Sequence, residues 1–476
     1  MKKVLCLLLT LLLLSGTLVG CSGKEDENGE GTGTLSVTAE DKYSDLPDIP
    51  VGQFGGDFNI LYPETQIYQT YYFAEDYTGI AVSDANYRRQ MNIEEHLGVK
   101  LKFIAGGEHK DIATKISTTA MSGDDSYQMA LTHCYIGVLG MAMGDYLLDY
   151  QDIEYVDLDA EWWNKSQMKQ VNIEGKLYFG TNSFIFHEPN VILFNKTIAN
   201  QYPDIGADAL YEHVENKTWT LEQMKVYASR ISVDSNDDSK PEEGTYGFTS
   251  QLDFELCAFM AVNDYYIADS NGDGTYTLKK YNQTIENLYS QIKGLMDQKY
   301  SYGWKWSKNQ EGAIKIDTGR TFFTTASLPD CITYTIEKKV SIGILPYPTL
   351  EEGRDYQMLD WAGFVVIPSS VAKPEVSGAV AELLAYYGEK DLKTEFYDVL
   401  LGTRSADNLK DSEMLDLIFD SLVCDPGMNL LNVETNAMAQ IFYAIPRAIK
   451  SGEGGLSSWF GTYYNTAKNA LNFDLY

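Results

Sequence analysis

The sequence predicts an α/β fold built in two lobes, and three observations lead to this prediction. Strand-like runs alternate with helical patterns along most of the chain. The segments between successive strands are long enough to hold a helix, which is typical of βαβ units on a largely parallel sheet. The chain has 476 residues, and 426 of them (476 minus 50) follow Pro50. That length exceeds what one hydrophobic core usually reaches, so two lobes are expected.

The first 20 residues predict an export signal. Lys2 and Lys3 are followed by an almost wholly aliphatic run over 4–14. A basic start, an apolar stretch and small residues before a cleavage point are typical of a secretory leader. The run is shorter than the roughly 20 residues of a membrane-spanning helix. We therefore interpret 1–20 as a signal peptide that is removed.

Cys21 follows this leader directly. The tetrapeptide Leu18-Val19-Gly20-Cys21 resembles the lipobox of bacterial lipoproteins, which implies that Cys21 becomes lipidated and forms the new N-terminus. The alternative is an ordinary cysteine beside a standard cleavage site. Residues 21–50 are rich in Gly, Glu, Asp, Ser and Thr. Such a segment cannot bury enough surface to offset its ordering, so we expect a flexible stalk over 21–50.

Helices and strands are expected from residue 57 onward. Residues 57–62 are typical of a strand, and a tyrosine-rich loop follows them. Asp84 is expected to cap a helix that ends at Gly98. The side chains spaced to bury one face of that helix are Tyr87, Met91 and Leu97. The next expected elements are a half-buried strand at 99–103, a helix through Ile112 and Ile116 to Gly123, and a strand at 127–131.

The same alternation continues toward the C-terminus, without an internal repeat. Helices are expected at about 219–230, 283–299, 375–389 and 411–422. Strand-like runs occur at 176–180, 191–195, 321–325, 340–345 and 363–367.

Charge and cysteine usage exclude some classes of partner. The chain carries 68 acidic and 37 basic side chains, a formal charge of −31 that becomes −33 when Lys2 and Lys3 leave with the leader. So negative a surface repels nucleic acid, because binding to nucleic acid depends on Lys and Arg neutralising phosphates. It also disfavours an anionic ligand. Four cysteines lie far apart among apolar neighbours and are expected to be buried thiols, with disulfides as the alternative. They are Cys134, Cys257, Cys331 and Cys424.

Several short motifs occur in order along nearly the whole mature chain. They are Glu174-Gly175-Lys176-Leu177-Tyr178, Phe194-Asn195-Lys196, Thr218-Trp219-Thr220-Leu221-Glu222, the helix around 288–296, and Phe322-Phe323-Thr324. In this order they resemble the extracellular solute-binding proteins of carbohydrate ABC transporters. The later runs at 344–348, 413–418 and 425–427 are similar to a divergent Gram-positive branch of that family.

The resemblance implies the type II periplasmic-binding-protein fold, a two-lobed flytrap with crossover hinge strands. Crossings near 183, 324 and 363 would place 51–183 and 325–363 in lobe one, and 184–324 and 364–476 in lobe two. The implied function is that of a substrate-binding lipoprotein, held by lipid on the outer face of the cell membrane. It would capture a carbohydrate as a monomer and deliver it to ABC permease subunits, without a cofactor.

Candidate ligand contacts are aromatic and polar residues beyond strand ends. A neutral sugar offers hydroxyls and C–H faces, and Tyr and Trp join a flat apolar body to a polar group. In α/β lobes, ligands lie beyond the carboxyl ends of the strands. Trp163, with its neighbour Trp162, either stacks on a sugar or fills lobe one. The expected set is Tyr68, Tyr71, Tyr72, His133, Tyr135, Trp163, Asn182, His187, Gln251, Asp253, Asp360 and Trp361.

The sequence gives little support for catalysis or for a metal. It has no HExxH, GxSxG, Walker lysine loop, or GxGxxG after a strand. Residues 269–274 fit the start of an EF-hand loop, but Lys280 stands where that loop needs Glu, so a hairpin is expected instead. We expect a protein that is not an enzyme. The alternatives are a glycoside hydrolase-like enzyme, which needs only two carboxylates, and a surface adhesin lipoprotein without a ligand.

Overall fold

The structure is a computed structural model that describes part of the chain. The described residues are 43–64, 72–134, 138–182, 187–202, 204–231, 244–304, 315–332, 340–361, 363–401, 409–429, 437–451 and 455–471. The chain divides into two units, Met1–Asp45 and Leu46–Tyr476, and every described helix and strand belongs to the second. The predicted signal peptide and Cys21 lie outside the described residues. None of the described helices combines the length and the apolar character that a membrane crossing requires.

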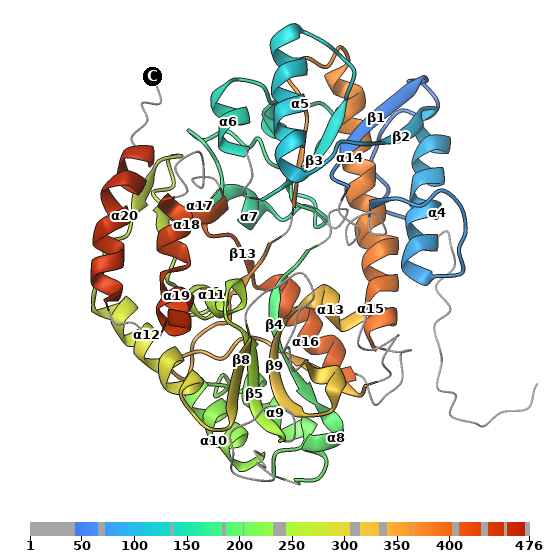
Figure 1. The fold of residues 1–476 in the computed structure, drawn as a ribbon. Helices are drawn as coiled ribbons and strands as arrows, with labels where there is room; N and C mark the ends of the chain where they lie inside the picture. The colour runs from blue at the N-terminus through green and yellow to red at the C-terminus, as the bar shows by residue number, and fades with distance from the viewer. Residues whose placement is uncertain are drawn as a thin grey trace, which may run out of the picture. The chain divides into compact units, whose positions relative to one another are not determined.

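One sheet contains the strands nearest the N-terminus. Its members are β1 (Asp57–Tyr62), β2 (Lys100–Ala105), β3 (Met129–His133) and β12 (Gly363–Val366), in the order β12-β3-β1-β2. Figure 1 labels β1, β2 and β3 of this sheet. β1 runs parallel to β2 and β3, whereas β12 runs antiparallel to β3. α4 (Ala81–Leu97) packs on β2 and α5 (His109–Ser122) packs on β3, and α14 (Pro374–Tyr387) packs on α4. These elements confirm the predicted βαβ pattern over 57–131.

α4 begins before its predicted cap. The Asp84 carboxylate lies inside the helix and accepts hydrogen bonds from the backbone N–H groups of residues 78–79. Gly98 ends the helix in the left-handed conformation (φ +77°), as predicted. The predicted burial of Met91 is wrong, because its side chain is 47% exposed. The buried stripe includes the polar Arg89, which hydrophobic spacing does not reveal.

A second large sheet has five strands. They are β4 (Asn190–Asn195), β5 (Tyr246–Gln251), β8 (Ser301–Trp304), β9 (Thr321–Ser327) and β10 (Ile342–Leu345), in the order β10-β4-β9-β5-β8. β5 is parallel to β8 and β9, and β4 is antiparallel to β9 and β10, so this sheet is mixed. Helices in contact with it include α8 (Lys196–Ala199), α9 (Ala207–Glu215), α10 (Leu221–Ile231), α11 (Phe254–Ala261), α12 (Gln283–Met296) and α16 (Leu409–Asp420).

The strand pairing differs from the predicted division of the chain at 325–363. β9 and β10 both belong to the five-stranded sheet, so the chain stays with that sheet beyond position 324. It rejoins the four-stranded sheet at β12, which the predicted division placed at the start of the second lobe. The physical reason is that β10 and β12 are short apolar runs whose pairing partners lie far away in the sequence. Hydrophobic spacing does not say which sheet such a run joins.

The remaining elements are short or lie toward the C-terminus. β11 (Met358–Leu359) pairs in parallel with β13 (Leu422–Val423), and β6 (Ala268–Ser270) pairs with β7 (Tyr276–Leu278) as the predicted hairpin. At that hairpin Asp269 pairs with Lys279 at 2.8 Å. The other helices are α6 (Val138–Met143), η1 (Tyr150–Asp152), α7 (Lys165–Gln170), η2 (Ile316–Thr318), α13 (Leu328–Ile332), the π-helical η4 (Gly388–Leu392), α15 (Lys393–Leu401), α17 (Pro426–Asn429), α18 (Ala437–Phe442), α19 (Ala444–Ser451) and α20 (Leu456–Leu471).

Cys134, Cys257, Cys331 and Cys424 are buried free thiols, as predicted. Burial raises the pKa of Cys134, Cys257 and Cys331 well above the ordinary value. The thiolate is the reactive form of cysteine, so these side chains act as small apolar core groups.

Candidate functional site

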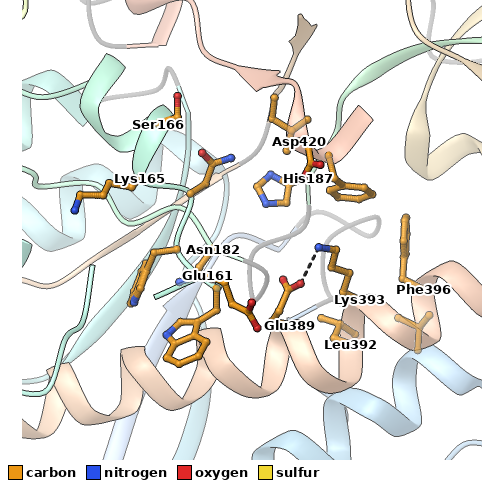
Figure 2. Close-up of a pocket in the computed structure, with 16 residues that line it drawn as sticks. Glu161, Lys165, Ser166, Asn182, His187, Glu389, Leu392, Lys393, Phe396 and Asp420 are labelled. Atoms are coloured by element: carbon orange, nitrogen blue, oxygen red, sulfur yellow. Dashed lines mark hydrogen bonds and ion pairs between the residues drawn. The ribbon is translucent and has the colours of Figure 1, made fainter. Parts of the chain in front are cut away.

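One cavity of about 390 Å³ brings together residues from distant parts of the chain (Figure 2). Its walls include α4 and α15, which pack on each other beside the four-stranded sheet, and α16, which packs on β10 of the five-stranded sheet. The lining residues are Val82, Glu161, Trp162, Trp163, Asn164, Lys165, Ser166, Asn182, His187, Glu389, Leu392, Lys393, Phe396, Phe419, Asp420 and Leu422.

Two adjacent tryptophans form one wall, and a single carboxylate holds both. The indole Nε1–H of Trp162 donates to Oε1 of Glu382 at 2.8 Å, and that of Trp163 donates to Oε2 at 2.7 Å. The backbone N–H of Asp157 donates to Oε2 at 3.2 Å. Glu382 lies on α14 and is fully buried. Burial raises the pKa of Glu382 to about 7, and the indole donors oppose that rise.

Hydrogen bonds at Trp163 and Asn164 hold the C-terminal end of the tryptophan wall. Asn164 caps α7 by accepting from the backbone N–H of Gln167 at 3.1 Å. Its own backbone N–H donates to the carbonyl of Thr181 at 2.9 Å, and Trp163 bridges to Asn182. Asn182 therefore reaches the cavity because its backbone pairs with the tryptophan segment.

His187 lies on the cavity wall with a buried aspartate behind it. Its Nδ1 lies 2.7 Å from Oδ2 of Asp360, and the same carboxylate accepts from Nε2 of Gln167 at 2.9 Å. Oδ1 of Asp360 accepts from the backbone N–H of Glu188 at 2.9 Å. A carboxylate only accepts, so Nδ1 of His187 carries the proton. In the neutral ring, Nε2 is then an acceptor for a ligand hydroxyl.

Most charged residues of the lining have a partner of opposite charge. Glu389 accepts from Lys393 at 2.7 Å, the contact drawn as a dashed line in Figure 2. Glu161 pairs with Lys390 at 3.0 Å, and Lys165 pairs with an aspartate outside the lining. Both lining lysines thus already face carboxylates. This arrangement favours an uncharged ligand over an anionic one.

Proteins of known structure share this fold. An ABC substrate-binding protein from Listeria monocytogenes, solved in complex with cycloalternan, matches with a TM-score of 0.55 over 88% of this chain and 100% of its own. The chain has the fold of an ABC substrate-binding protein. The two sequences are 13% identical, so the likeness concerns the fold. No protein-family model matches the chain, and no curated protein matches its sequence. The predicted fold class is confirmed.

Three of the predicted contact residues line the cavity of this substrate-binding fold. They are Trp163, Asn182 and His187, and the predicted Asp360 lies directly behind His187. Tyr68, Tyr71 and Tyr135 lie outside the described residues. The other predicted residues, which are not among the cavity's described lining, are Tyr72, His133, Gln251, Asp253 and Trp361.

Those five residues have structural partners, and Tyr72 and Gln251 have theirs through the backbone. The carbonyl of Tyr72 accepts from the Arg89 guanidinium at 3.0 Å, and the indole of Trp361 donates to an asparagine oxygen at 2.7 Å. His133 packs edge-on against another histidine, and burial, followed by that neighbour, lowers the pKa of His133 to about 3. Asp253 pairs with a lysine at 3.2 Å, and the backbone N–H of Gln251 donates to the buried Glu255.

Sequence reasoning missed the helical part of the lining. Glu389, Leu392, Lys393 and Phe396 lie on η4 and α15 rather than beyond a strand end. Their spacing of three to four residues is the ordinary pattern of one helix face and carries no functional signal by itself. The parts of the lining that the sequence predicted are Trp163, Asn182 and His187.

A second cavity of about 710 Å³ adjoins the first. The two share Ser166, Asp420 and Leu422 in their linings. Tyr266 and Tyr356 contribute aromatic surface to the second cavity. Among the described residues, no group of three or more His, Cys, Asp or Glu side chains is arranged to hold a metal ion.

Proposed function

We propose that the chain is an extracytoplasmic substrate-binding lipoprotein that captures an uncharged carbohydrate and delivers it to an ABC permease. One observation carries this proposal: two indoles, an imidazole and two carboxamides line one cavity in a chain with the substrate-binding fold. Indole surfaces meet the C–H faces of a sugar, and imidazole and amide groups bond its hydroxyls.

The electrostatics of the lining support a neutral ligand. The two lysines of the lining are paired, and the lining adds the carboxylates of Glu161, Glu389 and Asp420. A phosphorylated or carboxylated solute would meet repulsion there. Carboxylate oxygens also accept hydrogen bonds from sugar hydroxyls. The adjoining second cavity leaves room for a ligand longer than one ring.

We further propose that the ligand drives closure of one lobe onto the other. A ligand shifts such an equilibrium only through contacts that it makes in the closed form alone. A lining drawn from helices on both sheets offers such contacts. The permease would then recognise the closed form.

The experiment is a thermal-shift screen of the protein lacking residues 1–21. The probes are cycloalternan, linear gluco-oligosaccharides of one to seven units, amino acids and short peptides. A captured ligand should raise Tm with concentration, because stabilisation follows RT ln(1 + [L]/Kd), about 2.7 kcal/mol at a hundredfold excess over Kd. A rise with amino acids or peptides alone would refute the carbohydrate proposal. Chromatography of the recovered sugar detects cleavage, which would favour the glycosidase alternative.

A matched pair of histidine variants locates the ligand. His187→Ala removes a group from the cavity wall, so affinity should fall about tenfold for one hydrogen bond to a buried site. His213→Ala is the control, since its two ring nitrogens each have a partner at 2.7 Å outside this cavity. It should lower stability and leave affinity unchanged. Equal affinities in both variants would place the ligand elsewhere.

We also propose lipid anchoring through Cys21 on the outer face of the membrane, on the basis of the lipobox-like tetrapeptide. Stable anchoring generally takes two acyl chains, which a modified N-terminal cysteine can carry. Cys21→Ser should release the protein into the medium, and metabolic labelling with palmitate should lose its signal. Unchanged membrane fractionation of the variant would contradict this anchor.

A further inference from the structure

Trp162 and Trp163 are neighbours in the chain, yet both indoles bond to one carboxylate, that of Glu382. Neighbouring residues of an extended chain point to opposite sides. Here the backbone is bent, because the N–H of Trp163 bonds to the carbonyl of Ala160 at 3.2 Å. Each oxygen of Glu382 receives one indole N–H at 2.7–2.8 Å. Both rings of the wall therefore take their position from one side chain that does not itself line the cavity.

The remaining ring contacts do not replace this carboxylate. Trp162 packs edge-on against Tyr386, with ring centroids 5.1 Å apart, and Trp163 packs edge-on against Tyr150 at 5.5 Å. Edge-on contacts between aromatic rings stabilise by about 1 kcal/mol and tolerate rotation. Two hydrogen bonds to one charged acceptor are stronger and more directional.

We propose that Glu382 is the positioning residue of the candidate site: its charged carboxylate fixes both indoles of the wall and thereby sets the affinity for the ligand. The last step rests on the proposed function, whereas the placement of the indoles does not. A charged carboxylate accepts from all three donors that face it. A protonated one must donate its own O–H, and a glutamine presents an NH2 group to one of the donors.

This positioning is expected to respond to pH near neutrality, because burial raises the pKa of Glu382 to about 7. Asp157, on the segment that covers α14, also acts to raise it. On α4 the buried Arg89 bonds to Asn86 at 2.6 Å, and Asp391 of η4 acts to raise the pKa of Arg89. The cavity has further titratable groups, so the informative quantity is the difference between the wild type and Glu382→Gln at each pH.

The backbone of α14 supports the same arrangement. Gly378 lies four residues before Glu382, on the same face of the helix. A Cβ at position 378 would lie 2.1 Å from the carbonyl oxygen of Glu154. Only a glycine lets the covering segment approach α14 closely enough for its tryptophans to reach the carboxylate one turn further along.

The first readout needs no ligand. The protein contains seven tryptophans, and ¹⁵N-tryptophan labelling resolves their indole N–H signals by NMR. The variants Trp162→Phe and Trp163→Phe each remove one signal and thereby assign it. In the wild type both signals should shift together with a midpoint near pH 7. In Glu382→Gln, which mimics the protonated form, neither should titrate. Glu375→Gln on the first turn of α14 is the control and should leave both titrations intact.

The second readout is affinity for cycloalternan by calorimetry. At pH 9 Glu382→Gln should bind about tenfold more weakly than the wild type, and at pH 5.5 the two should bind alike. In a Trp163→Phe background the cost of Glu382→Gln should shrink, because one donor is gone. Indole signals that do not respond to Glu382→Gln would overturn the positioning role. A wild type that fails to bind cycloalternan would count against that ligand, while the indole titration would still decide the role of Glu382.

Discussion

Glu382 and Asp360 are both buried carboxylates that hold cavity-lining side chains, but their donors differ. Glu382 accepts from two indoles and one backbone N–H, and none of these donors can carry charge. Asp360 accepts from Gln167, from the backbone N–H of Glu188 and from the imidazole of His187. The tryptophan wall therefore depends on a carboxylate whose pKa burial raises, whereas the His187 side of the cavity depends on a carboxylate shared by an imidazole and an amide.

The largest expected effect is the loss of Asp360. Asp360→Ala would leave the His187 ring, an amide and a backbone N–H without their shared acceptor in a buried site. Removing one partner of such a buried network costs about 3 kcal/mol of unfolding free energy. Urea denaturation measures the loss. Asp355→Ala is the control, because that carboxylate is 84% exposed and its pairing with Lys217 contributes less than about 1 kcal/mol. Similar losses in both variants would show that the Asp360 network is not a stabilising one.

The next effect is a pH dependence of stability that comes from Glu382 behind the tryptophan wall. Glu382 has a pKa of about 7 in the folded chain and an ordinary value of 4.5, so the folded state holds its proton over that window. Its stabilising contribution is present below pH 4.5 and is lost as pH rises through 7, by up to about 3 kcal/mol. Glu382→Gln should therefore gain stability relative to the wild type between pH 5 and 8, measured by urea unfolding at each pH.

That stability gain is expected to accompany weaker ligand binding, because the charged form costs folding energy while it holds the indoles. Glu375→Gln is again the control and should show no such pH trend. A parallel stability profile for Glu382→Gln and the wild type would mean that Glu382 does not titrate in this range. A raised pKa would then no longer distinguish Glu382 from Asp360.

A smaller loss is expected from Gly378→Ala. The added methyl group would meet the Glu154 carbonyl, which belongs to the segment that carries the tryptophan wall. Overpacking of this kind costs about 1–3 kcal/mol, even though alanine is the better helix former. Gly294→Ala in α12 is the control, because nothing lies within 4 Å of its added Cβ and the helix should gain about 1 kcal/mol. Thermal denaturation of both variants tests the contrast. A stabilised Gly378→Ala would show that the covering segment can move away at no cost.

The sequence could predict local elements well and their assembly only in part. The strand at 57–62 and the helix ending at Gly98 follow from apolar spacing and a left-handed glycine, which are local signals. Which sheet β10 joins depends on its pairing with β4, far away in the chain, and no local pattern records it. Glu382 lies in the apolar stretch 379–384, where a lone carboxylate is indistinguishable from a surface residue until the facing indoles are known.

The candidate site shows the same contrast between local sequence signals and long-range packing. His187 and Asp360 could be chosen because both flank predicted strands, and the structure places them in contact. Trp163 could be chosen because adjacent tryptophans are conspicuous. The helical residues Glu389 and Phe396 could not, because their role depends on α15 lying beside α16, a packing contact that only the assembled chain shows.

The smallest expected effect comes from the ion pair on the helical wall. Glu389 and Lys393 are spaced i to i+4 on one helix face, with side chains 20% and 31% exposed. Such a pair contributes about 0.5 kcal/mol, because solvent screens it and both side chains lose freedom. Lys393→Met should therefore change the unfolding free energy by less than 1 kcal/mol, and the change should shrink between 10 and 500 mM salt. Urea titrations at the two salt concentrations measure this. A salt-independent loss above 2 kcal/mol would contradict this expectation. The Glu389–Lys393 pair would then stabilise the fold as strongly as the buried carboxylates of Glu382 and Asp360 do, and solvent screening would not distinguish them.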